Sequence, residues 1–388
     1  MKDVAVVNAK GRARWDRGHP WIYRSDVTRR PETGAGVVRV QDSRGKPIGS
    51  ALWSPASEIS LRLLDRNADV AIDALWWRQR LHEAIERRAP VAALTNAYRL
   101  VHGEADGCPS FICDRYDRWL VVQLMSAGIE SMRREIVDAL VDLAAPDGIL
   151  ARNDVPLRAK ERLPVTVELL SGTVPEEIEV SEHGVWFLAA PWAGQKTGAF
   201  LDQRENRVFI GERARGRALD CFSYHGSFAL HLARHASSVV ALDSSREALE
   251  RAGANATRNG FTNIELVEAD AFEFLRARER AREAFDTIVL DPPAFAKTRS
   301  ALPAAIRGYK EINLRAMRLL SPGGQLFTAS CSFHLTTPLF LDMLHSAAAD
   351  SGRRLALRAL TRQPADHPEV ITIPETGYLK GALVEALD

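Results

Sequence analysis

The chain contains few cysteines, and their placement argues against two kinds of site. Four are present among 388 residues: Cys108, Cys113, Cys221 and Cys331. They are too few and too scattered for a disulfide framework, and none has CxxC spacing with a distant partner pair. The loop HGEADGCPS at 102–110 is acidic but lacks spaced His or Cys partners, so we interpret it as a structural turn in preference to a metal site. We therefore expect reduced thiols and no metal.

The chain also lacks a long apolar run and an excess of either charge. Its longest uncharged apolar stretch, 119–129, is much shorter than the roughly 18 residues of a membrane span, and the first residues lack the apolar region of a signal peptide. Basic residues number 51 and acidic residues 50, so the formal net charge is +1. We expect a soluble, cytoplasmic protein in which contact with nucleic acid depends on local charge.

Local patterns divide the chain into three segments, in line with the two or three domains that 388 residues predict. Residues 1–72 alternate apolar and polar positions between Gly, Pro and Asp, which predicts a small β-barrel. Residues 73–188 predict an α/β domain with helices near 73–97 and 129–143. From 189 to 388 strands and helices alternate, which predicts a mainly parallel, doubly wound sheet.

The start of the chain is locally basic. Eight basic and three acidic residues up to Arg30 give a local charge of +5, and Trp15, Trp21 and Tyr23 lie among them. Cations interleaved with aromatic rings suit phosphates and unstacked bases, although a solvated barrel surface over core aromatics fits the pattern equally well. The candidate RNA-binding residues here are Lys10, Arg12, Arg14, Arg17, Trp21 and Arg24.

Carboxylates follow four successive strands of the last segment. They are Asp220, Asp243, Asp270 and Asp291. The carboxyl ends of parallel strands share one edge of a sheet, where ligands bind. A single Asp at a strand end is commonly a turn former or a helix N-cap, but four in order are harder to explain in that way.

The turn after the first of these strands argues against a dinucleotide. DCFSYHGSF has one glycine where G-x-G-x-x-G would approach a pyrophosphate. A nucleoside without pyrophosphate fits better: Asp243 would accept hydrogen bonds from ribose hydroxyls and Asp270 from an adenine amino group. Asp220 would help to hold an ammonium group. S-adenosylmethionine (SAM) has all three groups and no phosphate, so we predict SAM as the cofactor.

A set of motifs extends over nearly the whole chain and includes GHPWIYRSDV, RLVHGEADG, GQKTGAFLDQREN, DCFSYHGSFALH, DPPAFAK, TASCS, ADHPEV and ETGYLKG. These motifs resemble those of the ribosomal RNA large-subunit methyltransferase I family, SAM-dependent enzymes of class I that modify C5 of a cytosine in 23S rRNA. GQKTGAFLDQREN and TASCS are specific at this spacing, whereas DPP alone is weak. The resemblance implies a PUA-like RNA-binding domain at 1–72, a central α/β domain at 73–188 and a Rossmann-like methyltransferase domain at 189–388.

The resemblance further implies that Lys196 and Thr197 help to enclose the cofactor. Together with the strand-end carboxylates and the turn, it gives a cofactor-binding set of Lys196, Thr197, Asp220, Phe222, Tyr224, Gly226, Asp243, Asp270, Ala271 and Asp291.

Methylation of cytosine at C5 requires a reachable thiolate. Addition of a thiolate to C6 gives C5 enamine character, so that C5 can attack the methyl group; loss of the C5 proton and of the thiolate then completes the reaction. Cys331 ends the strand GGQLFTASC, on the edge where Asp291 is expected. Asp291 would hydrogen-bond or protonate N3, which needs a raised pKa or a proton from elsewhere, and Phe295 could stack on the base. The alternative for Cys331 is an inert buried side chain, as we expect for the other three cysteines.

Two positions depart from related enzymes. Many RNA cytosine-C5 methyltransferases have a cysteine after the two prolines that aids product release, and Ala294 stands there. Relatives often have Thr-Cys-Ser-Cys where this chain has TASCS, with Ala329 in place of the first cysteine. The assignment of the nucleophile therefore depends on Cys331.

The target base must leave its stack before it can react, at a cost of a few kcal/mol. The basic barrel, with Lys297 and Arg299 near the pocket, would offset that cost by holding the RNA backbone, and the nearly neutral remainder favours naked or partly assembled 23S rRNA as the partner. The sequence leaves open whether the protein forms a homodimer. Two alternatives also stay open: an amino-group methyltransferase acting on guanine or adenine, and a non-catalytic RNA-binding assembly factor.

Overall fold

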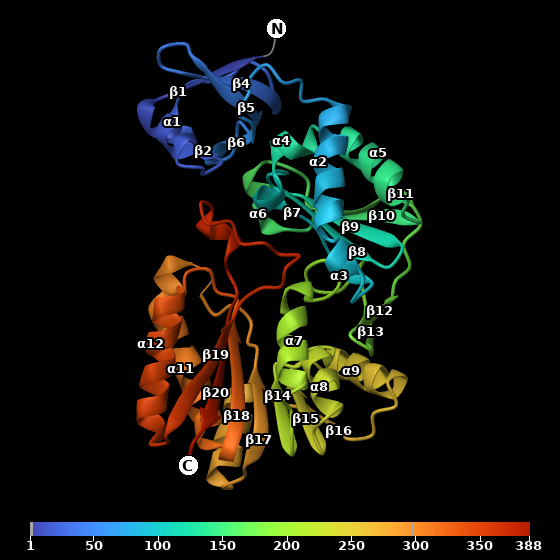
Figure 1. The fold of residues 1–388 in the computed structure, drawn as a ribbon, viewed down its shortest axis with the longest axis vertical. Coiled ribbons are helices and arrows are strands. Elements are labelled where there is room, and N and C mark those ends of the chain that lie inside the picture. The colour runs from blue at the N-terminus through green and yellow to red at the C-terminus, as the bar shows by residue number, and fades with distance from the viewer. Residues whose placement is uncertain (1–2, 297) are drawn as a thin grey trace. The chain divides into compact units, whose positions relative to one another are not determined.

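The computed structural model describes residues 3–296 and 298–388 and divides into two compact units (Figure 1). Unit 1 comprises Met1–Val180, Ala189–Leu201 and Ala365–Thr376, and unit 2 comprises Ser181–Leu188, Asp202–Pro364 and Gly377–Asp388. The predicted boundaries at 72 and 188 stay a prediction.

Unit 1 begins with a six-stranded sheet in the order β2-β6-β5-β4-β1-β3. Its elements are β1 (Val4–Val7), α1 (Ala9–Asp16), β2 (Trp21–Tyr23), η1 (Arg24–Asp26), β3 (Val27–Arg29), β4 (Gly36–Asp42), β5 (Pro47–Trp53) and β6 (Ile59–Asp65). The alternation of apolar residues predicts β1, β4, β5 and β6. Helix α1 has no strong apolar face and begins because the Asn8 side chain accepts a hydrogen bond from the Gly11 N–H. Trp15 is buried in the core of this domain, so it is not one of the aromatic rings available to RNA.

The central part of unit 1 is a five-stranded sheet in the order β11-β10-β9-β8-β7. Its elements are α2 (Ala74–Arg87), α3 (Ala89–Ala92), β7 (Ala97–His102), η2 (Gly103–Asp106), β8 (Phe111–Tyr116), β9 (Trp119–Leu124), α4 (Ala127–Glu130), α5 (Arg133–Ala144), β10 (Gly148–Arg152), α6 (Pro156–Lys160) and β11 (Val167–Gly172). Both predicted helices are interrupted. A proline at the start of α3 separates it from α2, and Ser126 caps the short helix α4 ahead of α5.

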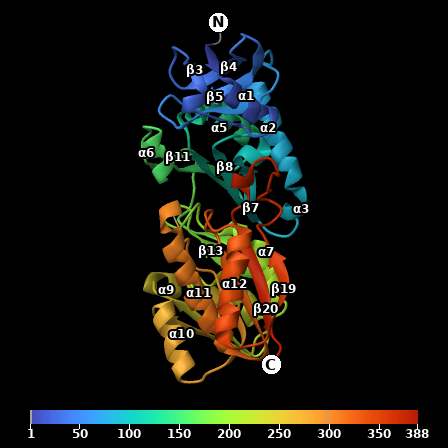
Figure 2. The same cartoon turned by 90° about the vertical axis from the view of Figure 1, so that its left-hand side faces the viewer.

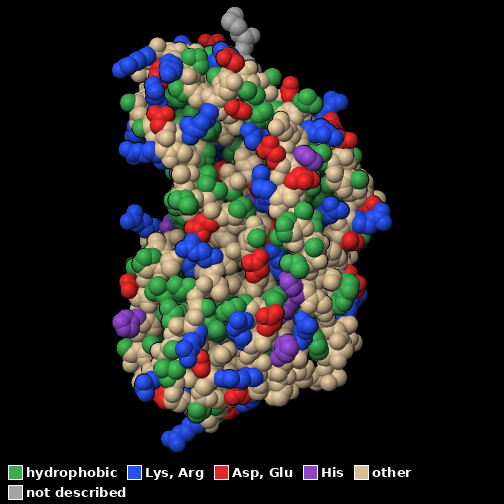
Figure 3. All heavy atoms as spheres, in the orientation of Figure 1, with side chains coloured by type: hydrophobic (Ala, Val, Ile, Leu, Met, Phe, Trp, Pro, Cys, Tyr) green, Lys and Arg blue, Asp and Glu red, His purple; other side chains and the backbone are tan. Residues whose placement is uncertain are grey.

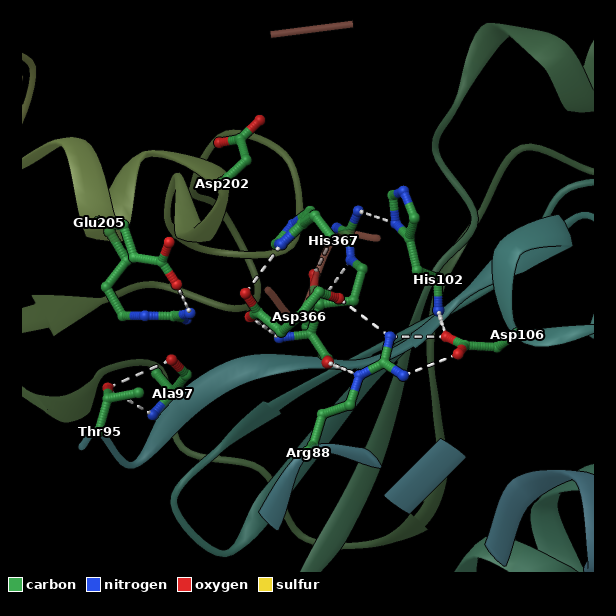
Figure 4. A network of polar contacts seen from close by, with 12 residues as sticks. Arg88, Thr95, Ala97, His102, Asp106, Asp202, Glu205, Asp366 and His367 are labelled. Carbon is green, nitrogen blue, oxygen red and sulfur yellow. Dashed lines mark hydrogen bonds and ion pairs between the residues drawn. The ribbon is translucent and has the colours of Figure 1, made fainter. Parts of the chain in front are cut away.

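The acidic loop after β7 forms the structural turn that the sequence predicts. The Asp106 carboxylate accepts hydrogen bonds from two guanidinium nitrogens of Arg88, at 2.7 and 2.6 Å, and from the His102 backbone N–H (Figure 4). Arg88 also donates to the carbonyl oxygen of Asp366. Among residues 3–296 and 298–388, no three His, Cys, Asp or Glu side chains are grouped to hold a metal ion.

Unit 2 contains a seven-stranded sheet in the order β16-β15-β14-β17-β18-β20-β19. Its strands are β14 (Arg217–Cys221), β15 (Ser238–Asp243), β16 (Ile264–Glu268), β17 (Phe285–Leu290), β18 (Leu320–Ser330), β19 (Leu355–Thr361) and β20 (Lys380–Ala386). Its helices are α7 (Arg204–Gly211), α8 (Ser227–Ala233), α9 (Arg246–Arg258), α10 (Ala271–Arg280), α11 (Leu302–Arg318) and α12 (Thr337–Ser351). The neighbouring strands β16, β15, β14, β17 and β18 pair in parallel, whereas β20 pairs antiparallel with β18 and with β19. The prediction of a mainly parallel sheet is therefore confirmed. A separate hairpin consists of β12 (Ile178–Glu182) and β13 (Val185–Ala189).

Helices cover both faces of this sheet (Figures 1 and 2). On β14, Leu219 packs into the cluster that includes α10, α11 and α12, whereas its neighbour Ala218 packs into the cluster that includes α7 and α8. Successive side chains of a strand point to opposite faces, so both faces of β14 are apolar and the strand is buried. Ligands of such sheets bind at the edge formed by the carboxyl ends of the strands, and the candidate site is therefore described there.

Charged side chains of both signs are interspersed over the face of the molecule in Figure 3, as the formal net charge of +1 leads one to expect. Within the part of the chain that the structure describes, no helix has the length and hydropathy needed to cross a membrane.

Candidate active site

The first strand-end carboxylate, Asp220, is fully buried. Its Oδ2 accepts hydrogen bonds from the Ser223 hydroxyl at 2.6 Å and the Ala229 N–H at 2.9 Å, whereas its Oδ1 has no hydrogen-bond partner among the described residues. Burial, with a smaller contribution from the negative charges of Asp291 and Asp243, raises the pKa of Asp220 to about 7. A buried acceptor oxygen with spare capacity fits the ammonium group at the methionine end of SAM.

The turn after β14 has an unusual backbone. Phe222 and Tyr224 have φ values of 66° and 50°, in the left-handed region that residues other than glycine seldom adopt. Gly226, at φ 86°, allows α8 to begin immediately, because a Cβ there would lie 3.0 Å from the Ala252 Cβ. The Tyr224 N–H donates a hydrogen bond to the Asp243 carboxylate at 2.8 Å, and this bond connects the turn to the end of β15. Strain of this kind persists where the surroundings fix the backbone, and it is concentrated at ligand sites.

Asp243 and Asp270 have different surroundings. Asp243 is half-buried, and its second oxygen accepts from the Ser245 N–H at 2.9 Å. Each carboxylate oxygen can accept a second hydrogen bond, so capacity for a ribose hydroxyl remains. Asp270 is exposed and caps α10 by accepting from the Glu273 N–H at 3.0 Å, beside the buried Ala271. The N-cap alternative thus accounts for the protein contact of Asp270, and its role toward adenine stays a prediction.

A glutamine positions Asp291. The Gln203 side-chain amide donates to Asp291 Oδ1 at 2.7 Å, and the Asn206 amide donates to Gln203 Oε1 at 2.6 Å. Both residues belong to the specific motif GQKTGAFLDQREN, but sequence reasoning did not assign them a role. The contact joins residues 88 apart in the chain, so no local pattern could predict it.

Cys331 and Asp291 lie at the same edge of the sheet. Leu290 of β17 pairs with Thr328 of β18, so Asp291 is in register with Ala329 and Cys331 is two residues farther along. These parallel strands are about 4.8 Å apart, and two residues advance a strand by about 7 Å. The spacing leaves both side chains within reach of one planar base.

The residues around Cys331 form a polar network. Cys331 itself is partly exposed, whereas its neighbours Ser330 and Ser332 are buried and make hydrogen bonds with the Tyr309 hydroxyl at 3.1 and 2.9 Å. The Lys380 ammonium group donates to the Ser332 carbonyl oxygen at 2.8 Å. Burial lowers the pKa of Lys380 to about 8, and the negative charge of Cys331 opposes that shift. Sequence reasoning missed Lys380, although it belongs to the matching motif ETGYLKG.

Phe295 lies in an aromatic cluster. Its ring centroid is 4.6 Å from that of Tyr309, 6.1 Å from Phe272 and 6.5 Å from Phe222. Stacking of this ring on a base stays a prediction. Lys297 lies outside the described residues, and Arg299 is exposed at the start of η4 (Arg299–Ala301).

Lys196 and Thr197 belong to unit 1 and have partners there. Thr197 is buried, and its hydroxyl donates to Asp114 at 2.6 Å and lies 3.1 Å from the Tyr116 hydroxyl. The Lys196 ammonium group is 4.6 Å from the centroid of the Phe200 ring. Their contact with the cofactor stays a prediction.

The predicted RNA-binding residues near the N-terminus fall into two groups. Some are engaged within the protein: Arg12 pairs with Asp42, and Arg24 donates to backbone carbonyls. The others, Lys10, Arg14 and Arg17, line a hollow of about 460 Å³ together with His19; here Lys10 lies 3.9 Å from Asp26, and the Arg14 guanidinium lies 4.5 Å from the centroid of the Tyr23 ring. Trp21 is half-buried, and its indole N–H donates to Glu104 at 2.8 Å.

The remaining cysteines are buried, as we expect for structural residues. Burial raises the thiol pKa of Cys108, Cys113 and Cys221, which keeps these thiols protonated and unreactive. Cys331 is the one cysteine of the four that is partly exposed.

Comparisons with known proteins agree with this geometry. Residues 100–380 match the model of an S-adenosylmethionine-dependent methyltransferase family, and residues 5–66 match that of a PUA-like domain. Proteins named ribosomal RNA large subunit methyltransferase I from Citrobacter koseri and from Escherichia coli O139:H28 are each 39% identical to this chain, in alignments that cover 97% of this chain and 98% of theirs.

Two solved structures have the same fold. A SAM-dependent methyltransferase from Streptococcus mutans superimposes with a TM-score of 0.83 at 20% identity. A methyltransferase complexed with SAH superimposes with a TM-score of 0.85, also at 20% identity. Each comparison covers 99% of this chain and 100% of the other.

Proposed function

We propose that this chain, which belongs to the ribosomal RNA large-subunit methyltransferase I family of SAM-dependent enzymes, forms 5-methylcytosine in 23S rRNA through a covalent bond between Cys331 and C6 of the target base. One observation carries the choice of chemistry: Cys331 is partly exposed at the carboxyl edge of the sheet, near Asp291 and the Lys380 ammonium group. Methylation of an exocyclic amino group would require no thiol at this position.

The cofactor is SAM, which supplies an electrophilic methyl group when bound. Asp220 would hold the ammonium group of SAM through its spare Oδ1, and Asp243 and Asp270 would accept from the ribose and the adenine. The turn containing Phe222, Tyr224 and Gly226 sets the position of these carboxylates relative to one another. Ala271, next to Asp270, belongs to the same proposed cofactor site in unit 2, whereas a role for Lys196 and Thr197 is the prediction made from the resemblance.

Cys331 then acts as the nucleophile. Its thiolate forms a C–S bond at C6, and the displaced electron pair builds charge at N3 and nucleophilicity at C5. The carboxyl group of Asp291, oriented by Gln203 and protonated for this step, donates a hydrogen bond to N3 as this charge develops. After C5 has taken the methyl group, loss of the C5 proton to a base returns the electron pair, breaks the C–S bond and releases the thiolate.

Lys380 is a positioning residue in this scheme. A thiolate is stabilised by a cation in its surroundings, and the Lys380 ammonium group is anchored to the residue that follows Cys331. The Tyr309 hydroxyl fixes the serines on both sides, which limits the motion of the Cys331 backbone.

The experiment uses RNA containing 5-fluorocytosine, from which the C5 substituent cannot leave as a proton. With SAM, the wild-type protein should form a stable adduct whose mass equals protein plus methylated RNA. Cys331→Ala should form no adduct and no methylated product, whereas Cys108→Ala should behave as wild type. Full methylation by Cys331→Ala would overturn the proposal and select amino-group methylation.

The state of the RNA substrate is tested separately. We propose that protein-free or partly assembled 23S rRNA is the substrate, because a base must be extruded and held by a protein with little net charge. Methyl incorporation into protein-free 23S rRNA should exceed that into mature large subunits, and equal incorporation would contradict this part of the proposal.

A further inference from the structure

Unit 1 contains a groove that the proposed chemistry does not use. Its volume is about 1060 Å³, and it lies between the N-terminal sheet domain and the central domain. The N-terminal domain contributes Trp21, Arg24 and Arg30 to its lining, and the central domain contributes Met125, Lys160 and Arg162. We call this space the unit 1 groove.

Buried polar contacts connect the two walls of the unit 1 groove. The guanidinium of Arg62 is 3.3 Å from the Glu161 carboxylate, and both side chains are buried. The indole N–H of Trp21 donates to Glu104 across the same space at 2.8 Å. The shape of the groove is therefore set before a ligand binds, and the carboxylates of Glu104 and Glu161 are already occupied by donors.

The rim of the groove carries an excess of positive charge, because its exposed carboxylate, Glu58, is already paired with Arg24 at 3.6 Å. Arg30, Lys160 and Arg162 are exposed, and the side chains of all three lack an ion-pair or hydrogen-bond partner among the described residues. This contrasts with the rest of the surface, where many Arg side chains pair with Asp or Glu. Three unpaired cations around one groove suit a polyanion.

The interior of the groove offers flat and apolar surfaces. The Trp21 ring is half-buried, and its orientation is fixed by its bond to Glu104 and by an edge contact with His19. Met125 and Leu157 add apolar surface, and the Leu157 side chain is 40% exposed. Cations along a groove with an aromatic ring inside it are the features by which proteins hold single-stranded nucleic acid.

We propose that the unit 1 groove binds a single-stranded segment of the rRNA substrate, a few nucleotides long and separate from the target base. Arg30, Lys160 and Arg162 contact phosphates, and Trp21 stacks on a base. This inference rests on the proposed rRNA substrate, but it does not depend on which atom of the target base is methylated. It assigns substrate recognition to the central domain as well as to the N-terminal domain.

The test measures binding of a fluorescein-labelled single-stranded RNA 12-mer and of the matching 12-base-pair duplex to the full chain. The double variant Lys160→Glu/Arg162→Glu should raise the Kd for the single strand at least tenfold. It should also reduce the slope of log Kd against log salt concentration by about 1.4, because each phosphate contact to a single strand contributes about 0.7. Trp21→Ala should weaken binding of the single strand at least fivefold with the salt slope unchanged.

The matched control is Arg118→Glu/Arg134→Glu, which changes the charge equally at two exposed arginines of the central domain that are paired with Asp147 and Asp138. Calorimetric SAM binding should be the same in all variants and shows that they are folded. Equal weakening by both double variants, or weakening for the duplex alone, would overturn the proposal. The 5-fluorocytosine adduct tests the role of Cys331 independently. If only the groove proposal is wrong, the adduct still forms; if only the C5 chemistry is wrong, the groove variants still weaken binding of the single strand.

Discussion

Replacement of Asp220 by Asn should stabilise the cofactor-free protein at alkaline pH while it weakens SAM binding. Asp220 is buried with one oxygen that has no hydrogen-bond partner among the described residues, so its negative charge is held at a cost in the absence of SAM. Asn has nearly the same shape and no charge. We therefore expect Asp220 to lower the free energy of unfolding of the cofactor-free protein and to strengthen binding of the SAM ammonium group.

The size of the effect follows from the pKa of Asp220, which burial raises from 3.8 to about 7. Between these pH values the folded chain retains a proton that the unfolded chain has lost, so the free energy of unfolding decreases as pH increases. Each pH unit contributes about 1.4 kcal/mol, so the wild type should lose roughly 3 kcal/mol between pH 5 and pH 8 through this group. Asn does not titrate and should not contribute to this loss.

The assay is urea unfolding followed by circular dichroism at pH 5 and pH 8. The free energy of unfolding of Asp220→Asn, relative to wild type, should be higher at pH 8 than at pH 5 by about 3 kcal/mol. At pH 8 the variant should bind SAM ten to a hundred times more weakly in calorimetry, since a hydrogen bond to a charged group contributes about 1.5–3 kcal/mol. Asp270→Asn, at an exposed N-cap, is the control for stability.

Two results would refute this reasoning. An equal response of Asp220→Asn and wild type to pH would mean that the Asp220 carboxyl titrates normally in the folded chain. Unchanged SAM affinity at pH 8 would mean that its spare oxygen does not face the ammonium group.

Three other predictions concern the residues that the structure adds. Lys380→Met should raise the thiol pKa of Cys331 by about 1–3 pH units, measured from the pH dependence of its alkylation by iodoacetamide, and Lys380→Arg should restore the wild-type pKa. Because the pKa of Lys380 is about 8, its charge stabilises the thiolate below that pH and is lost above it. Gln203→Ala should lower the single-turnover methylation rate about tenfold with unchanged SAM affinity, because Asp291 loses the donor that orients it; an equal loss of SAM affinity would contradict this role. Asp106→Ala should lower the free energy of unfolding, measured in urea, by about 3–5 kcal/mol, because it leaves the buried Arg88 guanidinium without its carboxylate partner. A decrease below about 1 kcal/mol would show that the ion pair is not needed for stability.

Periodic sequence patterns predicted the regular elements well. The alternation in β4, β5 and β6 and the repeated strand-helix order after 189 reflect which faces must be buried, and burial is encoded residue by residue. The patterns failed where a local cap or break decides the structure. The helix expected at 129–143 is divided, and α1 forms on the cap from Asn8 without a strong apolar face.

Candidate site residues could be predicted where they follow strands. Asp220, Asp243, Asp270, Asp291 and Cys331 come to one edge because parallel strands end there. Their individual environments could not be predicted: Asp220 is buried, whereas Asp270 is exposed and serves as a helix cap. Trp15 and Trp21 are the same residue type and lie six positions apart in the sequence, yet one is in the core and the other lines the unit 1 groove.

The sequence by itself determined the fold class, the edge of the sheet that holds the candidate site and the position of the candidate thiol, because the order of strands along the chain and the pattern of buried positions are local properties. Tertiary structure alone decided which groups surround that thiol and those carboxylates. Lys380 comes to Cys331 through the pairing of β18 with β20, and Gln203 comes to Asp291 from 88 residues away. The pKa and orientation of a reactive group depend on such distant neighbours, and they are fixed only when the chain is folded.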